Sequence, residues 1–301
     1  MEMIDKLPSP CELKEVLRPG TAAIAAKAAR DAEIASIIAG VAPCRPKLLM
    51  IIGPCSAHCP DAVLEYTLLL AATAGEVASK MVIVPRVYTA KPRSATRGYM
   101  GLIHEKGGLL AARKLHLDVL EQTGLSTADE LLYPALLPYF DDLVSYFAVG
   151  ARSVRNQEHR LVASGIAAPV GMKNPLCGDL SAMEAAVRAA QSPHRFIFRN
   201  AFVRTKGNAL AHGVLRGMDA APNHHKASTM AAPVIIDCSH GNSGKNPLKQ
   251  RDVALASIKM PNVRGLMIES FTHEGQSITD PCLCWPKTKE LIYEIAENWK
   301  I

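Results

Sequence analysis

The sequence lacks the features that mark membrane proteins, secreted proteins and nucleic-acid-binding tails. No uninterrupted apolar run approaches the roughly 20 residues that cross a bilayer. The first ten residues, MEMIDKLPSP, contain no apolar signal core, so we expect a cytoplasmic protein with reduced thiols. The net charge is +6, but lysine and arginine form no long block. We therefore expect neither a nucleic-acid nor a membrane partner.

Internal repeats and low-complexity linkers are also absent. The chain has 301 residues, which suits a single (β/α)8 barrel of about 250 residues with additions. Apolar residues make up 49% and charged residues 21% of the chain, so a large core is possible and global disorder is excluded. Most of the eight cysteines are expected to be small buried hydrophobic residues.

What is present is an alternation of short strands, rich in β-branched residues, with amphipathic helices. This alternation is typical of a parallel sheet. Eight strands, enough to close a barrel, are predicted at Leu48–Cys55, Met81–Tyr88, Glu130–Leu136, Phe147–Ser153, Pro169–Asn174, His194–Asn200, Pro233–Asn242 and Val263–Ser270. The third is the weakest because Pro134 interrupts it. The predicted fold class is an α/β protein, a (β/α)8 TIM barrel.

Helices are predicted between the strands at Asp61–Ser79, Gly108–Gln122, Asp179–Gln191 and Gln250–Ile258. An alanine-rich helix, Thr21–Ala39, precedes the first strand and is expected to cap the barrel or contact another subunit. A small inserted hairpin is predicted at Arg204–Leu215, after the sixth strand. These features divide the chain into an N-terminal helical extension, residues 1–47, and a barrel catalytic domain, residues 48–301.

Reactive residues follow the carboxyl ends of the predicted strands, where active sites of (β/α)8 barrels lie. One set offers a thiolate, an imidazole and two carboxylates: Cys55, His240, Glu269 and Asp280. This mixture suits Mn, Fe, Co or Zn better than Mg or Ca, which prefer oxygen ligands only. The second set is cationic: Arg86, Lys91, Arg93, Arg152, Lys173 and Arg216. Such a cluster would repel itself unless phosphate or carboxylate groups lay between its members.

Each of these residues also has an ordinary structural explanation. A lone cysteine at a strand end usually packs in the core, and a histidine in a loop usually makes a hydrogen bond. Single arginines and lysines are usually solvated, and a lone carboxylate usually pairs with a surface cation. The spacing alone leaves both interpretations open, although the repeated placement on one rim favours a site.

The motifs resemble those of a known family. GPCS followed by His58, RVYTAKPRS, GARSVRNQEHR, PVGMKN, VLRG, IDCSHGNS, IES and SITD occur in the order expected of type I 3-deoxy-D-arabino-heptulosonate 7-phosphate (DAHP) synthases. The resemblance extends from the alanine-rich helix to Trp285. It implies metal-dependent condensation of phosphoenolpyruvate with erythrose 4-phosphate, the first step of the shikimate pathway, in a homodimer or homotetramer.

The resemblance also implies roles for individual residues. By it, Cys55, His240, Glu269 and Asp280 resemble metal ligands. Phosphoenolpyruvate would be held by Arg86, Lys91, Arg152, Lys173 and Arg216. The aldose phosphate would meet Pro92, Arg93, Ser94 and Asn174. The metal would polarise the aldehyde as a Lewis acid. Lys91 would donate a proton to the developing alkoxide, so Lys91, Cys55 and His240 are the expected catalytic residues.

The sequence departs from the family pattern at several places. Ser94 replaces a common threonine, Pro175 replaces the glycine that usually follows Asn174, and the stretch between Glu269 and Asp280 is short. These differences leave open a related synthase that uses another aldose or aldose phosphate. A barrel that has lost catalysis and acts as a binding or regulatory subunit is a further alternative. The segment 133–139 does not match the segment that binds aromatic amino acids in regulated members, so weak or absent inhibition is expected.

Overall fold

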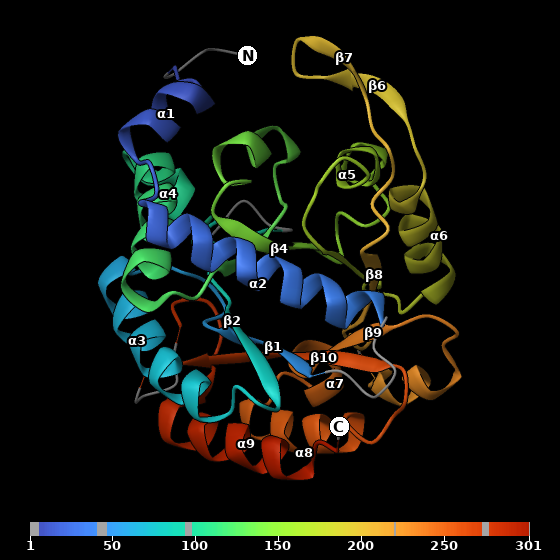
Figure 1. Ribbon diagram of the computed structural model, residues 1–301. Helices are drawn as coiled ribbons and strands as arrows, with labels where there is room; N and C mark the ends of the chain where they lie inside the picture. The colour runs from blue at the N-terminus through green and yellow to red at the C-terminus, as the bar shows by residue number, and fades with distance from the viewer. Residues whose placement is uncertain (1–5, 41–46, 94–97, 220, 273–276, 301) are drawn as a thin grey trace.

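The barrel predicted from the sequence is the core of the computed structural model, which describes residues 6–40, 47–93, 98–219, 221–272 and 277–300 (Figure 1). Ser94 lies outside the described residues. The strands lie side by side in the order β2-β1-β10-β9-β8-β5-β4-β3, all parallel. Their bounds are β1 Leu48–Gly53, β2 Met81–Pro85, β3 Thr127–Glu130, β4 Val144–Val149, β5 Val170–Lys173, β8 Ala211–Leu215, β9 Val234–Asp237 and β10 Val263–Phe271.

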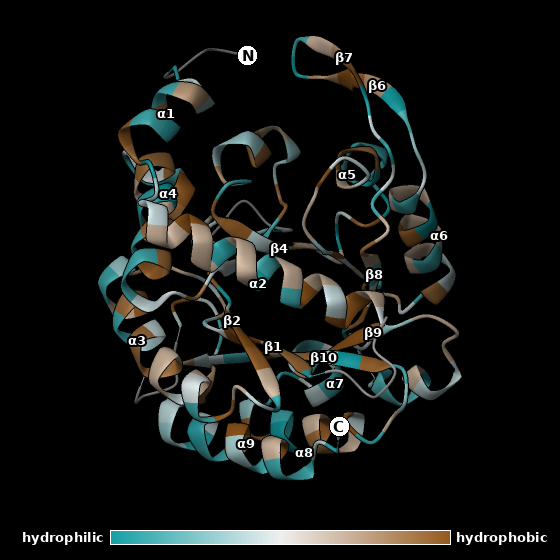
Figure 2. Cartoon of the chain, in the orientation of Figure 1, coloured by the Kyte–Doolittle hydropathy of each residue, from teal (hydrophilic) through white to brown (hydrophobic). Residues whose placement is uncertain are grey.

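The barrel strands are buried on both faces, which explains why they are nearly continuous apolar runs. All residues of β1, β2, β4, β5, β8 and β9 are buried. Figure 2 shows the hydrophobic colour concentrated on the central strands, while the outer helices carry hydrophilic residues on their exposed sides. Burial of these runs is the main driving force that holds the sheet in the middle of the molecule.

The sheet closes between its first and last strands, β2 and β3. Arg86 forms an isolated parallel bridge with Ala128, and the Val87 amide donates to the Ala128 carbonyl at 2.9 Å. On the other side of Arg86, β1 approaches so closely that a Cβ on Gly53 would lie 2.2 Å from the Arg86 carbonyl oxygen. Only glycine fits there, so the chain can enter the Pro54–Cys55 turn directly beside Arg86.

The remaining elements surround the barrel (Figure 1). The α-helices are α1 Pro10–Val16, α2 Thr21–Ala39, α3 Pro60–Glu76, α4 Gly108–Thr123, α5 Gln157–Ala163, α6 Leu180–Gln191, α7 His240–Ser243, α8 Gln250–Ser257 and α9 Trp285–Asn298. Short 3-10 helices are η1 Leu102–His104, η2 Pro134–Tyr139, η3 His224–Thr229 and η4 Pro247–Lys249. Strand β11, Leu283–Cys284, pairs with β10. None of the helices described is long and apolar enough to cross a membrane.

Helix α2 crosses one end of the barrel, as Figure 1 shows. Its bounds agree with the predicted Thr21–Ala39. Ile34, Ile37 and Ile38 pack against inward-facing residues of the barrel strands, including Leu49 and Met267. The barrel interior is therefore filled at this end by the helix, which confirms that the helix acts as a cap.

The third predicted strand, Glu130–Leu136, is wrong for most of its length. The strand is β3, Thr127–Glu130, and the chain then turns into the 3-10 helix η2, which begins at Pro134. Proline is favoured in the first turn of a helix because its missing N–H is not needed there. The apolar residues after Pro134 pack as a helix against the barrel, not as a strand within it.

The sixth predicted barrel strand is also wrong. Residues 194–200 contain β6, Arg195–Phe198, which pairs antiparallel with β7, Ala201–Arg204, as a hairpin outside the barrel. The sixth barrel strand is β8, inside the segment 204–215 that was predicted as the hairpin. Residues 195–198 alternate between exposed and partly buried, as in a strand outside the core. The sequence of β8, AHGVL, is short and contains glycine, so it did not stand out as a barrel strand.

Candidate active site

The carboxyl ends of the barrel strands enclose a cavity of about 320 Å³. It lies at the opposite end of the barrel from α2. All six cations predicted from the sequence line it: Arg86, Lys91, Arg93, Arg152, Lys173 and Arg216. Pro92, His240, Glu269 and Asp280 line it as well. The strand-end rule therefore brought together residues that are up to 194 positions apart, Arg86 to Asp280.

Arg86 forms the floor of this cavity, directly after β2. Its guanidinium donates to the carbonyls of Pro54 and Cys55 at 3.0 and 3.2 Å and to Glu269 Oε1 at 2.9 Å. The Tyr88 ring lies 3.8 Å from the guanidinium carbon. The side chain is only 2% exposed, so the Glu269 carboxylate is the group that balances its charge.

Lys91 lies against the predicted metal ligand Cys55. Its Nζ donates to the Cys55 carbonyl at 2.8 Å and to Cys55 Sγ at 2.7 Å. Burial and the Glu269 carboxylate raise the pKa of the Cys55 thiol, while the charges of Lys91 and Arg86 oppose that rise. Ionisation of this buried thiol therefore requires additional positive charge close to sulfur.

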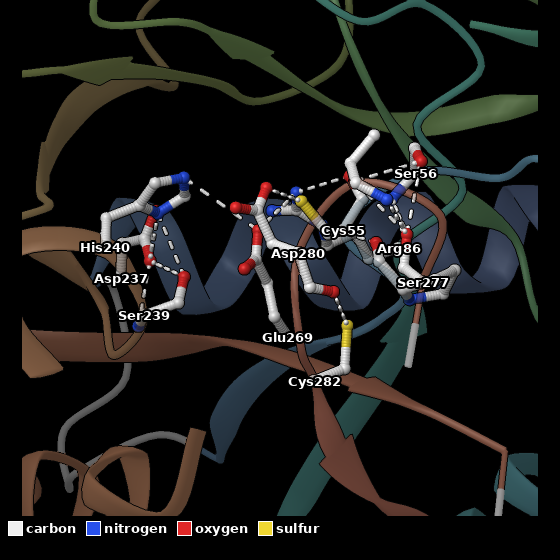
Figure 3. A network of polar contacts seen from close by, with 12 residues as sticks. Cys55, Ser56, Arg86, Asp237, Ser239, His240, Glu269, Ser277, Asp280 and Cys282 are labelled. Atoms are coloured by element: carbon white, nitrogen blue, oxygen red, sulfur yellow. Dashed lines mark hydrogen bonds and ion pairs between the residues drawn. The ribbon is translucent and has the colours of Figure 1, made fainter. Parts of the chain in front are cut away.

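Asp237, at the end of β9, was missed in the sequence. Its carboxylate accepts from Lys173 Nζ at 2.7 Å and lies 3.0 Å from His240 Nδ1 (Figure 3). Burial would raise the pKa of Asp237, but His240 and Lys173 hold it well below its usual value. The carboxylate occupies the Nδ1 side of the imidazole, so that Nε2 points toward Glu269. Partners of this kind orient histidines that bind metals.

His240 adopts an unusual backbone conformation, with φ of 51°. A left-handed conformation costs a residue other than glycine about 1–2 kcal/mol. The turn is held by a hydrogen bond from the Lys245 amide to the His240 carbonyl at 2.7 Å and by the contact of Ser239 Oγ with His240 Nδ1 at 2.9 Å. The strain therefore lies where the imidazole is directed into the cavity.

Glu269 is fixed from two directions. Gln250 of α8 accepts from the Glu269 amide at 2.8 Å and donates to the Glu269 carbonyl at 2.9 Å. Burial would raise the pKa of the carboxyl group, but Arg86, His240 and Lys91 outweigh it and lower the pKa to about 2. The side chain is consequently ionised across the physiological range. Gln250 was not predicted, because nothing in its local sequence indicates a backbone clamp.

The four predicted metal ligands form two close pairs (Figure 3). Cys55 Sγ lies 3.0 Å from Asp280 Oδ2, and His240 Nε2 lies 3.8 Å from Glu269 Oε1. Ser277, which contacts both the amide and the hydroxyl of Ser56, anchors the segment that carries Asp280. No group of three or more histidine, cysteine, aspartate or glutamate side chains in the described ranges already has the spacing of a metal site. The metal centre therefore stays a prediction.

Two guanidinium nitrogens in this region are buried without a hydrogen-bond partner, Arg86 Nη1 and Arg216 Nη1. Both side chains line the cavity and both are less than 5% exposed. An unsatisfied buried donor costs free energy, and a charged donor costs more. Phosphate and carboxylate groups suit bidentate arginine contacts, so an anion is the kind of ligand that matches these two side chains.

The residues predicted to meet the aldose phosphate have different positions. Pro92 and Arg93 line the cavity, and the Arg93 Nε donates to the Tyr99 carbonyl at 2.9 Å. Asn174 is fully buried and does not line the cavity. Its side chain instead accepts from the Arg216 amide at 2.9 Å and donates to the Gly217 carbonyl at 3.0 Å. Asn174 therefore supports the turn that carries Arg216.

Comparisons with known proteins identify the family to which this chain is similar. The model of the DAHP synthetase I family matches residues 27–300. The Tyr-sensitive phospho-2-dehydro-3-deoxyheptonate aldolase of Escherichia coli is 39% identical, over 88% of this chain and 85% of that protein. The phospho-2-dehydro-3-deoxyheptonate aldolase of Corynebacterium glutamicum is 35% identical, over 97% and 91% of the two chains. A solved structure of that aldolase from Francisella tularensis has a TM-score of 0.91 and 31% identity, covering 99% and 98%.

The Glu269–Arg86 pair predicts a specific dependence of stability on pH. Because the folded pKa of Glu269 is about 2 and its ordinary value is 4.5, its contribution is present above pH 4.5 and is lost as the pH falls toward 2. Glu269→Gln should cost about 3 kcal/mol of unfolding free energy at pH 7, since Arg86 is left unpaired. The unfolding free energies of Glu269→Gln and the unmodified protein, measured by urea titration with a chelator present, should become more similar below pH 4.5. A difference that stays constant with pH would contradict this assignment.

Proposed function

The chain belongs to the DAHP synthetase I family, and on that premise we propose that it condenses phosphoenolpyruvate with erythrose 4-phosphate, giving DAHP and inorganic phosphate. The observation that carries the proposal is the cavity itself. Six cationic side chains, two of them with unsatisfied buried guanidinium nitrogens, adjoin a thiol, an imidazole and two carboxylates. A doubly anionic small molecule matches the first group, and a divalent cation matches the second.

Phosphoenolpyruvate binds to the cations of the cavity. Arg86, Lys173 and Arg216 are nearly fully buried and reach the floor from three different strand ends, while Arg152 is exposed nearer to the mouth. Because Asp237 and Glu269 already balance Lys173 and Arg86, the cations keep fixed positions before the ligand arrives. Preorganised donors lose little conformational entropy on binding, and they hold both anionic ends of the substrate in one orientation.

The reaction then joins two carbon atoms. C3 of phosphoenolpyruvate forms a bond with the aldehyde carbon, and the aldehyde oxygen takes a proton from the Lys91 ammonium. Water adds at C2, and phosphate leaves with cleavage of its C–O bond. Lys91 suits the donor role because it is 9% exposed and its Nζ lies against Cys55, between the cation cluster and the predicted metal ligands.

A divalent transition metal, Mn, Fe, Co or Zn, is part of the proposal. Cys55, His240, Glu269 and Asp280 would hold it, and when bound it would supply a Lewis acid for the aldehyde oxygen. The donor chemistry fits: the set combines soft and hard ligands, and Asp237 holds the imidazole with Nε2 toward Glu269. The thiol also needs a nearby cation to ionise. A cytoplasmic location, where cysteine thiols are kept reduced, is part of the same proposal.

Another aldose acceptor is the second candidate. Asp219 lines the cavity and is mostly exposed, with its Oδ1 3.7 Å from Arg216 Nη1. A carboxylate in the cavity lining lowers the positive charge of the cavity as a whole. This charge disfavours a second phosphate group and favours an acceptor with more hydroxyls and fewer charges. No comparable observation favours the alternative of a barrel that has lost catalysis. Turnover of any aldehyde acceptor would exclude that alternative.

A homodimer or homotetramer is also proposed, with the β6–β7 hairpin in a subunit contact. Ile197 and Phe202 on this hairpin are 65% and 71% exposed, and Figure 2 shows hydrophobic colour along it. Exposed apolar side chains that lie together on a surface mark sites of contact with another protein. Phe202→Asp should lower the molar mass measured by light scattering after size exclusion. Leu248→Asp, an exposed leucine far from the hairpin in sequence, is the control and should leave the mass unchanged. An unchanged mass for Phe202→Asp, or a monomeric unmodified protein, would contradict the contact.

The substrate assignment is tested by phosphate release. With phosphoenolpyruvate and Mn, the protein should turn over erythrose 4-phosphate faster than other aldoses and aldose phosphates in a panel. Lys173→Ala should raise KM for phosphoenolpyruvate at least about tenfold, since each factor of ten corresponds to only 1.4 kcal/mol of lost binding. Lys249→Ala, an exposed lysine outside the cavity, is the control.

The same assay tests the expected weak or absent inhibition by aromatic amino acids, when phenylalanine or tyrosine is added. Inhibition at micromolar levels would refute that expectation.

The metal prediction has its own readout. A chelator should abolish turnover, and Mn, Co or Fe should restore it. Cys55→Ala should bind less than about a tenth of the metal that the unmodified protein binds, measured by elemental analysis after gel filtration, because thiolate is the softest ligand of the set. Cys177→Ala, an exposed cysteine outside the set, should bind metal normally. Full metal content in Cys55→Ala would remove that residue from the centre.

A further inference from the structure

The segment that joins Arg86 to Lys91 carries two cations of the cavity but has no regular secondary structure after the bridge at Arg86. Its alternate amides are bonded to β3 and to Met100. The Val87 amide donates to the Ala128 carbonyl at 2.9 Å, and the Lys91 amide donates to the Met100 carbonyl at 2.9 Å. Between them, the Thr89 amide donates to a side chain, Asp129 Oδ1, at 3.0 Å. A carboxylate thus takes the place that a backbone carbonyl would have in a longer strand.

Asp129 lies at the centre of a buried polar cluster that the mechanism above does not use. Besides the Thr89 amide, its carboxylate accepts from the Thr89 hydroxyl at 2.6 Å and from the Glu130 amide at 2.7 Å. His116 Nε2 of α4 lies 3.1 Å from Asp129 Oδ2, and His116 Nδ1 lies 2.8 Å from the Thr127 hydroxyl. With both ring nitrogens occupied, the imidazole has one orientation and the carboxylate has little freedom to turn.

The burial of this cluster is nearly complete. His116 and Thr127 are not exposed at all, Thr89 is 2% exposed and Asp129 is 5% exposed. A buried carboxylate and its partners cost free energy compared with well-packed apolar side chains of the same size. The visible result of the cluster is that Thr89 is fixed at both its amide and its hydroxyl. We infer that the cluster serves geometry more than stability.

The opposite side of Thr89 is equally constrained. Its carbonyl accepts from the Ile103 amide at 3.2 Å, and Gly101 approaches so closely that a Cβ there would lie 2.5 Å from the Thr89 oxygen. Gly101 has φ of 108°, a conformation that other residues rarely adopt. Thr89 is therefore held between Asp129 and the Gly101 turn. Two residues further along, the Lys91 ammonium lies 2.7 Å from Cys55 Sγ.

We propose that Asp129, oriented by His116, is a positioning residue that places Lys91 for proton donation to the aldehyde oxygen, a role that rests on the proposed function. Asp129 does not line the cavity, so it acts through Thr89. Lys173 and Arg216 follow other strands, and within the described residues their hydrogen bonds and ion pairs are made outside this cluster. Loss of the cluster should therefore displace Lys91 and leave Lys173 and Arg216, two of the cations assigned to phosphoenolpyruvate, in place.

Two substitutions remove the contact in different ways. Asp129→Asn keeps the size of the side chain but offers one acceptor oxygen where the carboxylate offers two. Thr89→Val keeps the shape and removes only the hydroxyl. Each should lower kcat at least about tenfold, since a displacement near 1 Å can cost as much as a hundredfold. KM for phosphoenolpyruvate should change less than about threefold. Thr89→Ser, which restores the hydroxyl, should recover most of the lost kcat.

The matched control is Asp142→Asn. Asp142 accepts two hydrogen bonds at 2.7 Å from Arg113, which is fully buried on α4 one turn before His116. The same change of residue therefore breaks a partly buried contact of the same helix. This contact lies on the side that faces the N-terminal segment, where Arg113 also donates to the Leu17 carbonyl. Asp142→Asn should lower the melting temperature and leave kcat within about twofold.

Hydrogen exchange separates failure of this inference from failure of the proposed function. In Asp129→Asn the peptide that covers residues 86–93 should exchange faster than in the unmodified protein, and this measurement needs no turnover. If the unmodified protein lacked turnover, the proposed function would fail. If it were active and Asp129→Asn lowered kcat no more than Asp142→Asn, or raised KM instead, the positioning role would be overturned. Failure of Thr89→Ser to recover kcat would overturn it as well.

Discussion

The contact between the Arg86 guanidinium and the Glu269 carboxylate, 2.9 Å apart and almost without solvent, determines how the cavity is built. Arg86 follows β2 and Glu269 belongs to β10, and these strands flank β1 in the sheet. The pair therefore spans the turn in which β1 ends, and the same guanidinium also binds the Cys55 carbonyl. Either ion alone would be strongly destabilising in this position. Together they hold three neighbouring strand ends at a common level, with both charges close enough to act on the Cys55 thiol.

The parts of the fold that the sequence predicts well are those in which one pattern dominates. The alanine-rich helix has the bounds Thr21–Ala39 in both cases, and the apolar run at residues 263–271 is the longest barrel strand. Prediction fails where tertiary packing decides. Residues 195–198 have strand-forming residues but pair with a neighbouring exposed strand, and β8 is recognisable as a barrel strand only from its burial between β5 and β9.

The candidate site divides in a similar way. The rule that functional groups follow barrel strands finds most of the cations and predicted ligands, because it needs only their positions in the sequence. It does not explain Arg216, which follows β8, the strand that was predicted as part of a hairpin. It also gives no role to Asp237, Gln250 or Asp129. Their importance comes from partners that are distant in the sequence. Asp237 contacts Lys173, 64 residues away, and Gln250 contacts Glu269, 19 residues away. Asp129 contacts Thr89, 40 residues away. A polar residue within a strand or at the start of a helix gives no local sign of which group it will contact, so these supporting contacts require the folded structure.

The isoleucines of α2 have a consequence for the order of events at the other end of the barrel. Because Ile34, Ile37 and Ile38 fill the interior beneath the strands, molecules must pass through the mouth in both directions. Arg86, Lys173 and Arg216 are deeply buried, whereas Arg93 and Arg152 are more accessible. A molecule bound to the deep cations leaves the mouth open for a second molecule. A second molecule bound nearer to the mouth blocks the exit of the first. In a cavity with one opening, binding and release are therefore sequential: the inner molecule is retained once the outer molecule has bound, and it can leave again only after the outer molecule has left.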